Sequence, residues 1–163
     1  MSHLTNVLTA AALVGSFVCA GTATANADPT DTLAASLSKG YSSSNCKSTV
    51  GPSGVQAVIE CGQNSDPSGP VFAKYLLFGS AGDLSGAFTS SIAADALANC
   101  GDVKSPSPWH QGASTDAAGQ LACGTYQGQA EVIWTTDAKT VMSLIRASNG
   151  DTAALYTWWK ANG

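Results

Sequence analysis

Cysteine is the residue type in this chain whose number and spacing best predict chemistry. Cys46, Cys61, Cys100 and Cys123 follow an apolar N-terminal stretch that holds a fifth cysteine, Cys19. An even set of cysteines in an exported protein usually forms a disulfide framework. Zinc binding is not expected, because the four lie too far apart to form C-x-x-C pairs and the chain supplies few histidines as further ligands.

A weak internal repeat favours one pairing of these cysteines. In each half of the chain a helical pattern leads to a cysteine, then to a loop and a strand pattern that carries Cys-Gly. Pairing within each half joins Cys46 to Cys61 and Cys100 to Cys123, and loop-closure entropy gives each bond about 3 kcal/mol. Crossed pairing and free thiols are the alternatives.

Catalytic chemistry has few candidate residues. His110 is the only histidine after residue 27, and no Gly-x-Ser-x-Gly motif presents a serine to it. No Gly-rich phosphate loop follows a strand pattern. Glu60, Glu131 and Asp137 lie on or beside predicted strands, where alternation points the two glutamates to solvent and Asp137 suits a turn. We therefore predict no catalytic residue, no metal site and no cofactor.

Ligand binding is the chemistry for which the longest predicted loop is best suited. Trp109 and His110 lie in that loop, residues 102–119, and loops on a rigid scaffold often carry binding residues. An indole offers a large surface for stacking on sugars, peptides or other rings. The alternative is that Trp109 folds back as a lid on the core beside the second disulfide. Tyr126, at the end of a predicted strand, is our third candidate ligand contact.

Hydrophobic periodicity and turn signals predict the elements that must position these residues. We expect helices over 31–39, from 80 to about 99 and from 151 onward, and strands over 55–61, 71–78, 121–126, 130–136 and 140–147. Ser80 with Asp83 resembles a capping box, and Asp151 suits an N-cap. The order α-β-β-α-β-β-β-α predicts an α+β fold, with an antiparallel sheet of about five strands covered on one face by the helices.

The remaining aromatic and basic side chains of these elements have structural interpretations. Leu155, Trp158 and Trp159 form one stripe of the last helix, which we expect to dock on the sheet with Trp134 as its core partner. An exposed aromatic platform is the alternative. Lys74 lies in an otherwise apolar strand, and we expect its side chain to reach solvent at the sheet edge.

The N-terminus predicts export. Residues 7–20 are an apolar run of signal-peptide length, and Ala25-x-Ala27 predicts cleavage before Asp28. Cys19 does not fit a lipoprotein signal, because the small and aliphatic residues required before it are absent. The run is too short to span a bilayer. We expect a signal peptide over 1–27, a single secreted domain over 28–163 and no stable membrane insertion after cleavage.

Charge narrows the class of partner. The chain has 7 Lys and Arg against 11 Asp and Glu, for a net charge of −4, and its basic residues are scattered singly. Nucleic acids and anionic lipid surfaces call for clustered Lys and Arg, so neither is an expected partner. The expected partner is an envelope ligand or protein of unknown identity.

A set of short motifs carries a family resemblance. The motifs are Gly40-Tyr41 before Cys46, Glu60-Cys61-Gly62, residues 75–78, 123–126, 132–135 and 155–159. With them the chain, over roughly 33–161, resembles small secreted actinobacterial proteins, mycobacterial ones in particular. It also resembles the extracytoplasmic C-terminal domain of some actinobacterial membrane serine/threonine protein kinases. The resemblance implies binding or sensing outside the cell, and it supplies no catalytic residues. We expect neither a kinase domain nor a membrane anchor here.

Three functions follow as expectations. The first is a non-enzymatic binding module of the cell envelope or culture medium that meets a small ligand, a glycan or a protein. The second is a small secreted hydrolase that uses His110 or carboxylates. The third is a secreted protein-interaction module. Turnover that is lost when His110 and Glu131 are both replaced by alanine would favour the hydrolase.

Overall fold

The computed structural model describes residues 27–163. The predicted signal peptide, apart from Ala27, lies outside the described residues, as does Cys19. None of the helices in the described part is long and apolar enough to cross a membrane.

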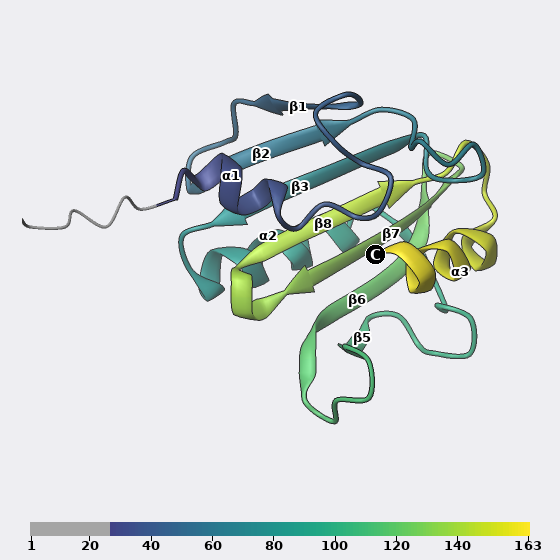
Figure 1. The fold of residues 1–163 in the computed structure, drawn as a ribbon. Helices are drawn as coiled ribbons and strands as arrows, with labels where there is room; N and C mark the ends of the chain where they lie inside the picture. Colours follow the sequence, from purple (N-terminus) through teal and green to yellow (C-terminus); the bar gives the residue numbers. More distant parts are fainter. Residues whose placement is uncertain (1–26) are drawn as a thin grey trace, which may run out of the picture.

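One antiparallel sheet of 8 strands forms the centre of the molecule (Figure 1). Its strands are β1 (Cys46–Thr49), β2 (Val55–Cys61), β3 (Phe72–Phe78), β4 (Ala96–Ala98), β5 (Ser107–His110), β6 (Ala117–Tyr126), β7 (Gln129–Thr136) and β8 (Val141–Arg146). They lie in the order β1-β2-β3-β8-β7-β6-β4, and β5 also pairs with β6. The prediction of an α+β fold with an antiparallel sheet is confirmed, but the prediction of about five strands is wrong.

The additional strands are β1, β4 and β5, which are three or four residues long. Two of them lie in segments predicted as loops, and β4 lies where the second helix was expected to continue. Strands this short carry too little alternation to be recognised in a sequence. They form because a longer neighbour, β2 or β6, offers free backbone hydrogen-bonding groups along its edge.

The helices cover both faces of the sheet, so the prediction that they cover one face is wrong. α1 (Pro29–Ala34) and α3 (Thr152–Asn162) lie on one face, and α2 (Ala81–Ile92) lies behind the sheet in Figure 1. A 3₁₀ turn, η1 (Asp137–Lys139), joins β7 to β8. The central strands are apolar on both sides, as Val132 and Ile133 on β7 illustrate, and each side therefore needs a cover.

Two apolar cores result. The first lies under α1 and α3 and includes Tyr75, Trp134 and Leu155, and the second lies under α2 around Phe88 and Met142. Trp134 contacts α3 as predicted, with its ring centroid 5.8 Å from that of Trp159.

The predicted starts of the second and third helices are confirmed, whereas the first helix, predicted over 31–39, spans Pro29–Ala34. Ser80 Oγ accepts a hydrogen bond from Asp83 N (3.1 Å), and Asp151 Oδ1 accepts one from Ala154 N (2.9 Å). α2 ends at Ile92 rather than near residue 99, because the following segment pairs with β6 as β4.

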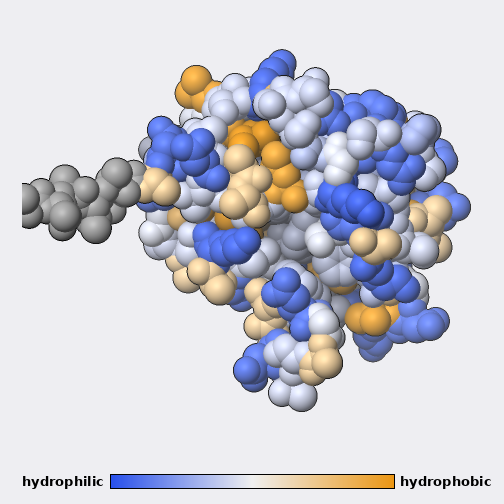
Figure 2. Space-filling view, in the orientation of Figure 1, coloured by the Kyte–Doolittle hydropathy of each residue, from blue (hydrophilic) through white to orange (hydrophobic). Residues whose placement is uncertain are grey.

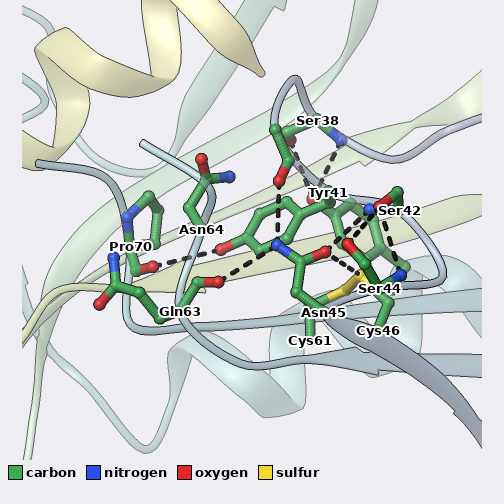
Figure 3. The surroundings of a disulfide bond; sticks show 12 residues. Ser38, Tyr41, Ser42, Ser44, Asn45, Cys46, Cys61, Gln63, Asn64 and Pro70 are labelled. Carbon is green, nitrogen blue, oxygen red and sulfur yellow. Dashed lines mark hydrogen bonds between the residues drawn. A yellow bond between two sulfur atoms is a disulfide. The ribbon is translucent and has the colours of Figure 1, made fainter. Parts of the chain in front are cut away.

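The first disulfide joins residues that lie directly opposite each other on β1 and β2, Cys46 and Cys61. Figure 3 shows Asn45 beside this bond. Its amide nitrogen donates to the carbonyl oxygens of Gly40 (3.0 Å) and Gln63 (3.2 Å). The loop before β1 is therefore held on the sheet both covalently and by hydrogen bonds.

The second disulfide joins Cys100, just after β4, to Cys123 on β6. The pairing within each half of the chain is thus confirmed at both sites. Two disulfides suit a protein of an oxidising compartment.

Two predictions for charged side chains need correction. Lys74 lies on β3, between β2 and β8, so the predicted position at a sheet edge is wrong, although its side chain is 31% exposed and its Nζ lies 2.9 Å from Glu60 Oε1. Glu131 is 4% exposed rather than solvent-facing, because it accepts hydrogen bonds from the Arg146 guanidinium (2.7 Å from Nε).

Candidate ligand-binding site

A hollow walled by aromatic rings lies between α3 and the segment around β5, which projects below the sheet in Figure 1. We call it the aromatic hollow. Its volume is about 420 Å³, within the range of small-molecule sites. Its lining residues are Val103, Pro108, Trp109, His110, Gln111, Gly112, Leu121, Tyr156, Trp159, Lys160 and Gly163.

The short strand β5 positions Trp109. The β5–β6 register sets Trp109 opposite Gly119, and its Nε1 donates to the carbonyl oxygen of Thr135 (2.7 Å). A Cβ on Gly119 would lie 2.0 Å from that oxygen, so only glycine fits there. Trp109 is half-buried and packs on the first core, and it also forms one wall of the hollow. Trp109 therefore covers the core, as the alternative prediction has it, and also lines the candidate site.

Helix α3 supplies the opposite wall. Residues 155 and 159, four apart, point into the core, while Tyr156 lies half-buried beside them. The Trp159 ring meets Trp109 edge-on (5.7 Å, 83°) and stacks on Tyr156 (5.7 Å, 17°). The three rings make a continuous aromatic surface.

The indole N–H of Trp159 is an unmet donor in this wall. Trp159 is 8% exposed, and its Nε1 has no hydrogen-bond partner. Gly163, which also lines the hollow, is so close to the indole that a Cβ there would lie 2.5 Å from Nε1. Buried donors are nearly always satisfied in folded proteins. This nitrogen has almost no accessible surface, so its neighbours separate it from the hollow that the Trp159 ring lines.

Lys160 and His110 bring positive or polar character to the rim. Both are exposed, and the Lys160 ammonium lies 5.0 Å from the centroid of the Tyr156 ring. Neither of the two ion pairs among residues 27–163 includes Lys160. The lining includes no Asp or Glu side chain.

The structure brings together two of the three predicted ligand contacts. Trp109 and His110 line the aromatic hollow, but Tyr126 lies on the α2 side of the sheet. There its ring contacts the Arg146 guanidinium (4.7 Å to the centroid), which also contacts Phe72 (5.5 Å). Tyr126 is thus placed in a charged cluster rather than with Trp109.

The carboxylates considered for catalysis lie outside the aromatic hollow. Burial raises the pKa of Glu131, and the Arg146 guanidinium opposes this shift. Burial likewise raises the pKa of the neighbouring Asp95, whose Oδ1 has no hydrogen-bond partner. Asp137 accepts a hydrogen bond from Thr135 Oγ1 (2.7 Å). The structure therefore does not join His110 to a carboxylate in this hollow.

Sequence reasoning did not identify Tyr156, Trp159 and Lys160 as site residues. Trp159 is predicted to lie in the core, and it does. Its ring also forms part of the wall of the hollow, because the hollow borders the core at this point. The available signal was the Tyr156–Lys160 pair, four residues apart on the flank of the buried stripe.

A second, smaller hollow of about 170 Å³ lies between α1 and β1, lined by residues that include Ala34, Leu37 and Ile59. Figure 2 shows apolar surface in this region of the face. No unmet polar atom borders it among the described residues, so it gives no indication of a particular ligand.

Within residues 27–163, no group of three or more His, Cys, Asp or Glu side chains lies close enough together to hold a metal ion.

Comparison of the chain with protein-family models, curated proteins and solved structures finds no match.

Proposed function

We propose that this chain is a non-enzymatic binding domain of the cell envelope or its surroundings that takes a small ring-bearing ligand in the aromatic hollow. One observation carries the proposal: the rings of Trp109, Tyr156 and Trp159 contact one another and together line one hollow. A bound ring would cover this wall through stacking and edge-to-face contacts.

The shape of the hollow supports a small ligand. Rings set at right angles, as Trp109 and Trp159 are, form a corner that can hold one flat molecule by its face and its edge. The walls are fixed before binding, because Trp109 is hydrogen-bonded to Thr135 and Trp159 is buried in the core. A ligand would therefore meet a preorganised site and lose little affinity to ordering of the protein.

The compartment is part of the proposal. The two disulfides favour a protein that acts outside the cytoplasm, in line with the signal peptide expected over 1–27. The resemblance to extracytoplasmic kinase domains points in the same direction, toward sensing or carrying rather than catalysis.

The test uses the four indole N–H resonances of the oxidised protein in ¹⁵N NMR spectra. The probes are naphthalene derivatives of different charge and a methyl glycoside. We expect at least one probe to shift the Trp159 resonance saturably, while Trp158, whose Nε1 is bonded to Asp66 (3.0 Å) outside the hollow, changes little.

A matched pair of variants locates the binding. Tyr156→Ala removes a half-buried wall and should weaken binding about three- to tenfold. Thr157→Ala changes the next residue of α3, which is exposed outside the hollow, and should leave affinity unchanged. If no probe shifts the Trp159 resonance at millimolar concentration, the proposed function is wrong.

A further inference from the structure

We infer that a separate polar hollow beside the start of α3 binds an uncharged polyhydroxyl ring, which is the chemistry of a neutral sugar. The inference goes beyond the proposed function and does not depend on it, because the polar hollow and the aromatic hollow share no lining residue. The volume of the polar hollow is about 300 Å³, at the lower end of the range of small-molecule sites, which suits one sugar ring. Its walls include Gln63, Ser68, Ser148, Asn149, Asp151 and Trp158.

The sheet topology brings the two polar turns of this hollow together. β3 begins and β8 ends at the same end of the sheet, where Phe72 lies opposite Arg146. The turn before β3 (63–70) and the turn after β8 (147–151) are therefore neighbours, and the N–H of Val71 donates to the carbonyl oxygen of Arg146 (2.9 Å) between them. α3 follows the second turn and supplies a further wall.

Trp158 gives the polar hollow an aromatic wall in a fixed orientation. The residue is half-buried, and its indole N–H donates to Asp66 Oδ2 (3.0 Å). Gly69 packs beside the same nitrogen, and a Cβ there would lie 3.1 Å from it. The ring is therefore positioned before a ligand arrives, and an indole face suits the C–H face of a sugar ring.

The polar side chains of the hollow retain both acceptors and a donor. Gln63 Nε2 donates to the carbonyl oxygens of Asp66 and Gly69 (3.4 Å each), which leaves its Oε1 as an acceptor. Asn149 Oδ1 accepts from the N–H of Asp151 (3.0 Å), which leaves Nδ2 as a donor. Asp151 caps α3 with Oδ1, so its second oxygen is another acceptor. A sugar hydroxyl both donates and accepts, so a polyol can use this mixed supply.

The charge of the hollow disfavours an anion. Asp151 lines it, and none of the described residues in its lining is Lys, Arg or His. Lys39 affects the pKa of Asp66 but does not line the hollow. The carboxylate of Asp151 already occupies the positive end of α3. A cation, in turn, has no acceptor for the Asn149 amide donor, whereas an uncharged hydroxylated ring uses the donor and the acceptors together.

The experiment compares ligands that differ in charge or in hydroxyl content. The neutral sugars are methyl glucoside, methyl galactoside and methyl mannoside. The matched controls are methyl glucuronide, an amino derivative of the glucoside with an ammonium at the same carbon, and cyclohexylmethanol, which keeps the ring but loses the polyol.

Binding to the oxidised protein is followed in ¹⁵N NMR spectra through the Trp158 indole N–H and the backbone N–H groups of Gly69 and Ser148. We expect at least one neutral glycoside to shift these signals saturably at millimolar concentration, and to bind about threefold or more tightly than each control. The indole signals of Trp109 and Trp159 should not move.

Variants locate the site. Gln63→Ala removes an acceptor of the hollow and should weaken glycoside binding about threefold. Ser65→Ala changes an exposed residue of the same turn outside the hollow and should leave affinity unchanged. Trp158→Leu removes the stacking wall and should weaken binding about tenfold, as read from the backbone signals. If Trp158→Leu does not fold, the pair Gln63→Ala and Ser65→Ala decides.

The outcomes distinguish this inference from the proposed function. A glycoside that shifts the Trp109 and Trp159 signals but not that of Trp158 overturns the polar hollow as a sugar site and leaves the proposed function standing. Equal or tighter binding of any control overturns the assignment to a neutral sugar. Unchanged affinity in Gln63→Ala refutes the site. If no glycoside shifts the Trp158 signal, the inference is wrong, while the naphthalene probes still test the aromatic hollow.

Discussion

At the scale of single residues, Glu131 is the side chain most constrained by its surroundings. Its carboxylate is buried on β7 between neighbouring strands and bonded to Arg146, and Asp95 lies close enough to influence its charge. Burial favours the neutral acid, while Arg146 favours the carboxylate. The net result is a pKa raised above the usual 4.5.

This shift predicts a pH dependence of stability. An acid whose pKa is higher in the folded state binds more protons there, so its contribution to stability falls as pH rises from about 4.5 through the folded-state pKa. Glu131→Gln removes this titration. We expect the free energy of unfolding, measured in urea at several pH values, to fall less steeply over that window in the variant. Identical pH profiles for the two proteins would contradict the assignment.

At Gly119 the Thr135 backbone leaves no room for a side chain. Gly119→Ala would place a Cβ 2.0 Å from the Thr135 oxygen that holds Trp109. We expect a loss of about 2–3 kcal/mol from overpacking, together with a change in the Trp109 indole N–H resonance. Denaturant unfolding and ¹⁵N spectra check both effects. A variant as stable as the wild type, with an unmoved Trp109 resonance, would show that the contact is not needed.

At the scale of elements, α2 offers a matched comparison. Gly86 lies exposed within the helix, and a Cβ there would meet no atom within 4 Å. Gly86→Ala should therefore stabilise the protein by about 0.5–1 kcal/mol through helix propensity. Ser80→Ala, which removes the N-cap, should cost about 1 kcal/mol. The urea concentration at the unfolding midpoint measures both effects. If the two variants shifted this midpoint in the same direction, this account of α2 would be contradicted.

Elements also show where prediction from the sequence succeeds. The strands β3, β6, β7 and β8 and the start of α2 were predicted to within a few residues, because apolar alternation and a capping side chain are encoded in adjacent residues. β4 and β5 were not predicted, since strands of three and four residues show too little alternation to be recognised and form only by pairing with β6.

At the scale of the whole molecule, the disulfides fasten the two outer parts of the sheet. Cys46–Cys61 closes a separation of 15 residues and Cys100–Cys123 one of 23. Replacing either pair by alanine should cost about 3 kcal/mol, slightly more for the longer loop. Thermal unfolding of the two double variants checks this, with the oxidised wild type as the reference. A double variant with an unchanged melting temperature would contradict it.

The aromatic hollow also depends on the whole molecule, because its walls come from segments far apart in the chain. Tryptophan at 109 was recognised as a candidate from its loop, but its partners lie some fifty residues later on α3. No local pattern relates these segments, and only the packing of α3 beside β6 brings them together.

The amino-acid sequence by itself favoured the disulfide pairing that the structure has, and it determined the main strands and the caps of α2 and α3, because each depends on spacing or on neighbouring residues. The tertiary structure alone decided that α2 covers the second face, that Glu131 is buried against Arg146, and that Trp109 meets Tyr156 and Trp159. The physical reason is that strands apolar on both sides leave the placement of each helix open. That choice is made by packing between residues far apart in the chain.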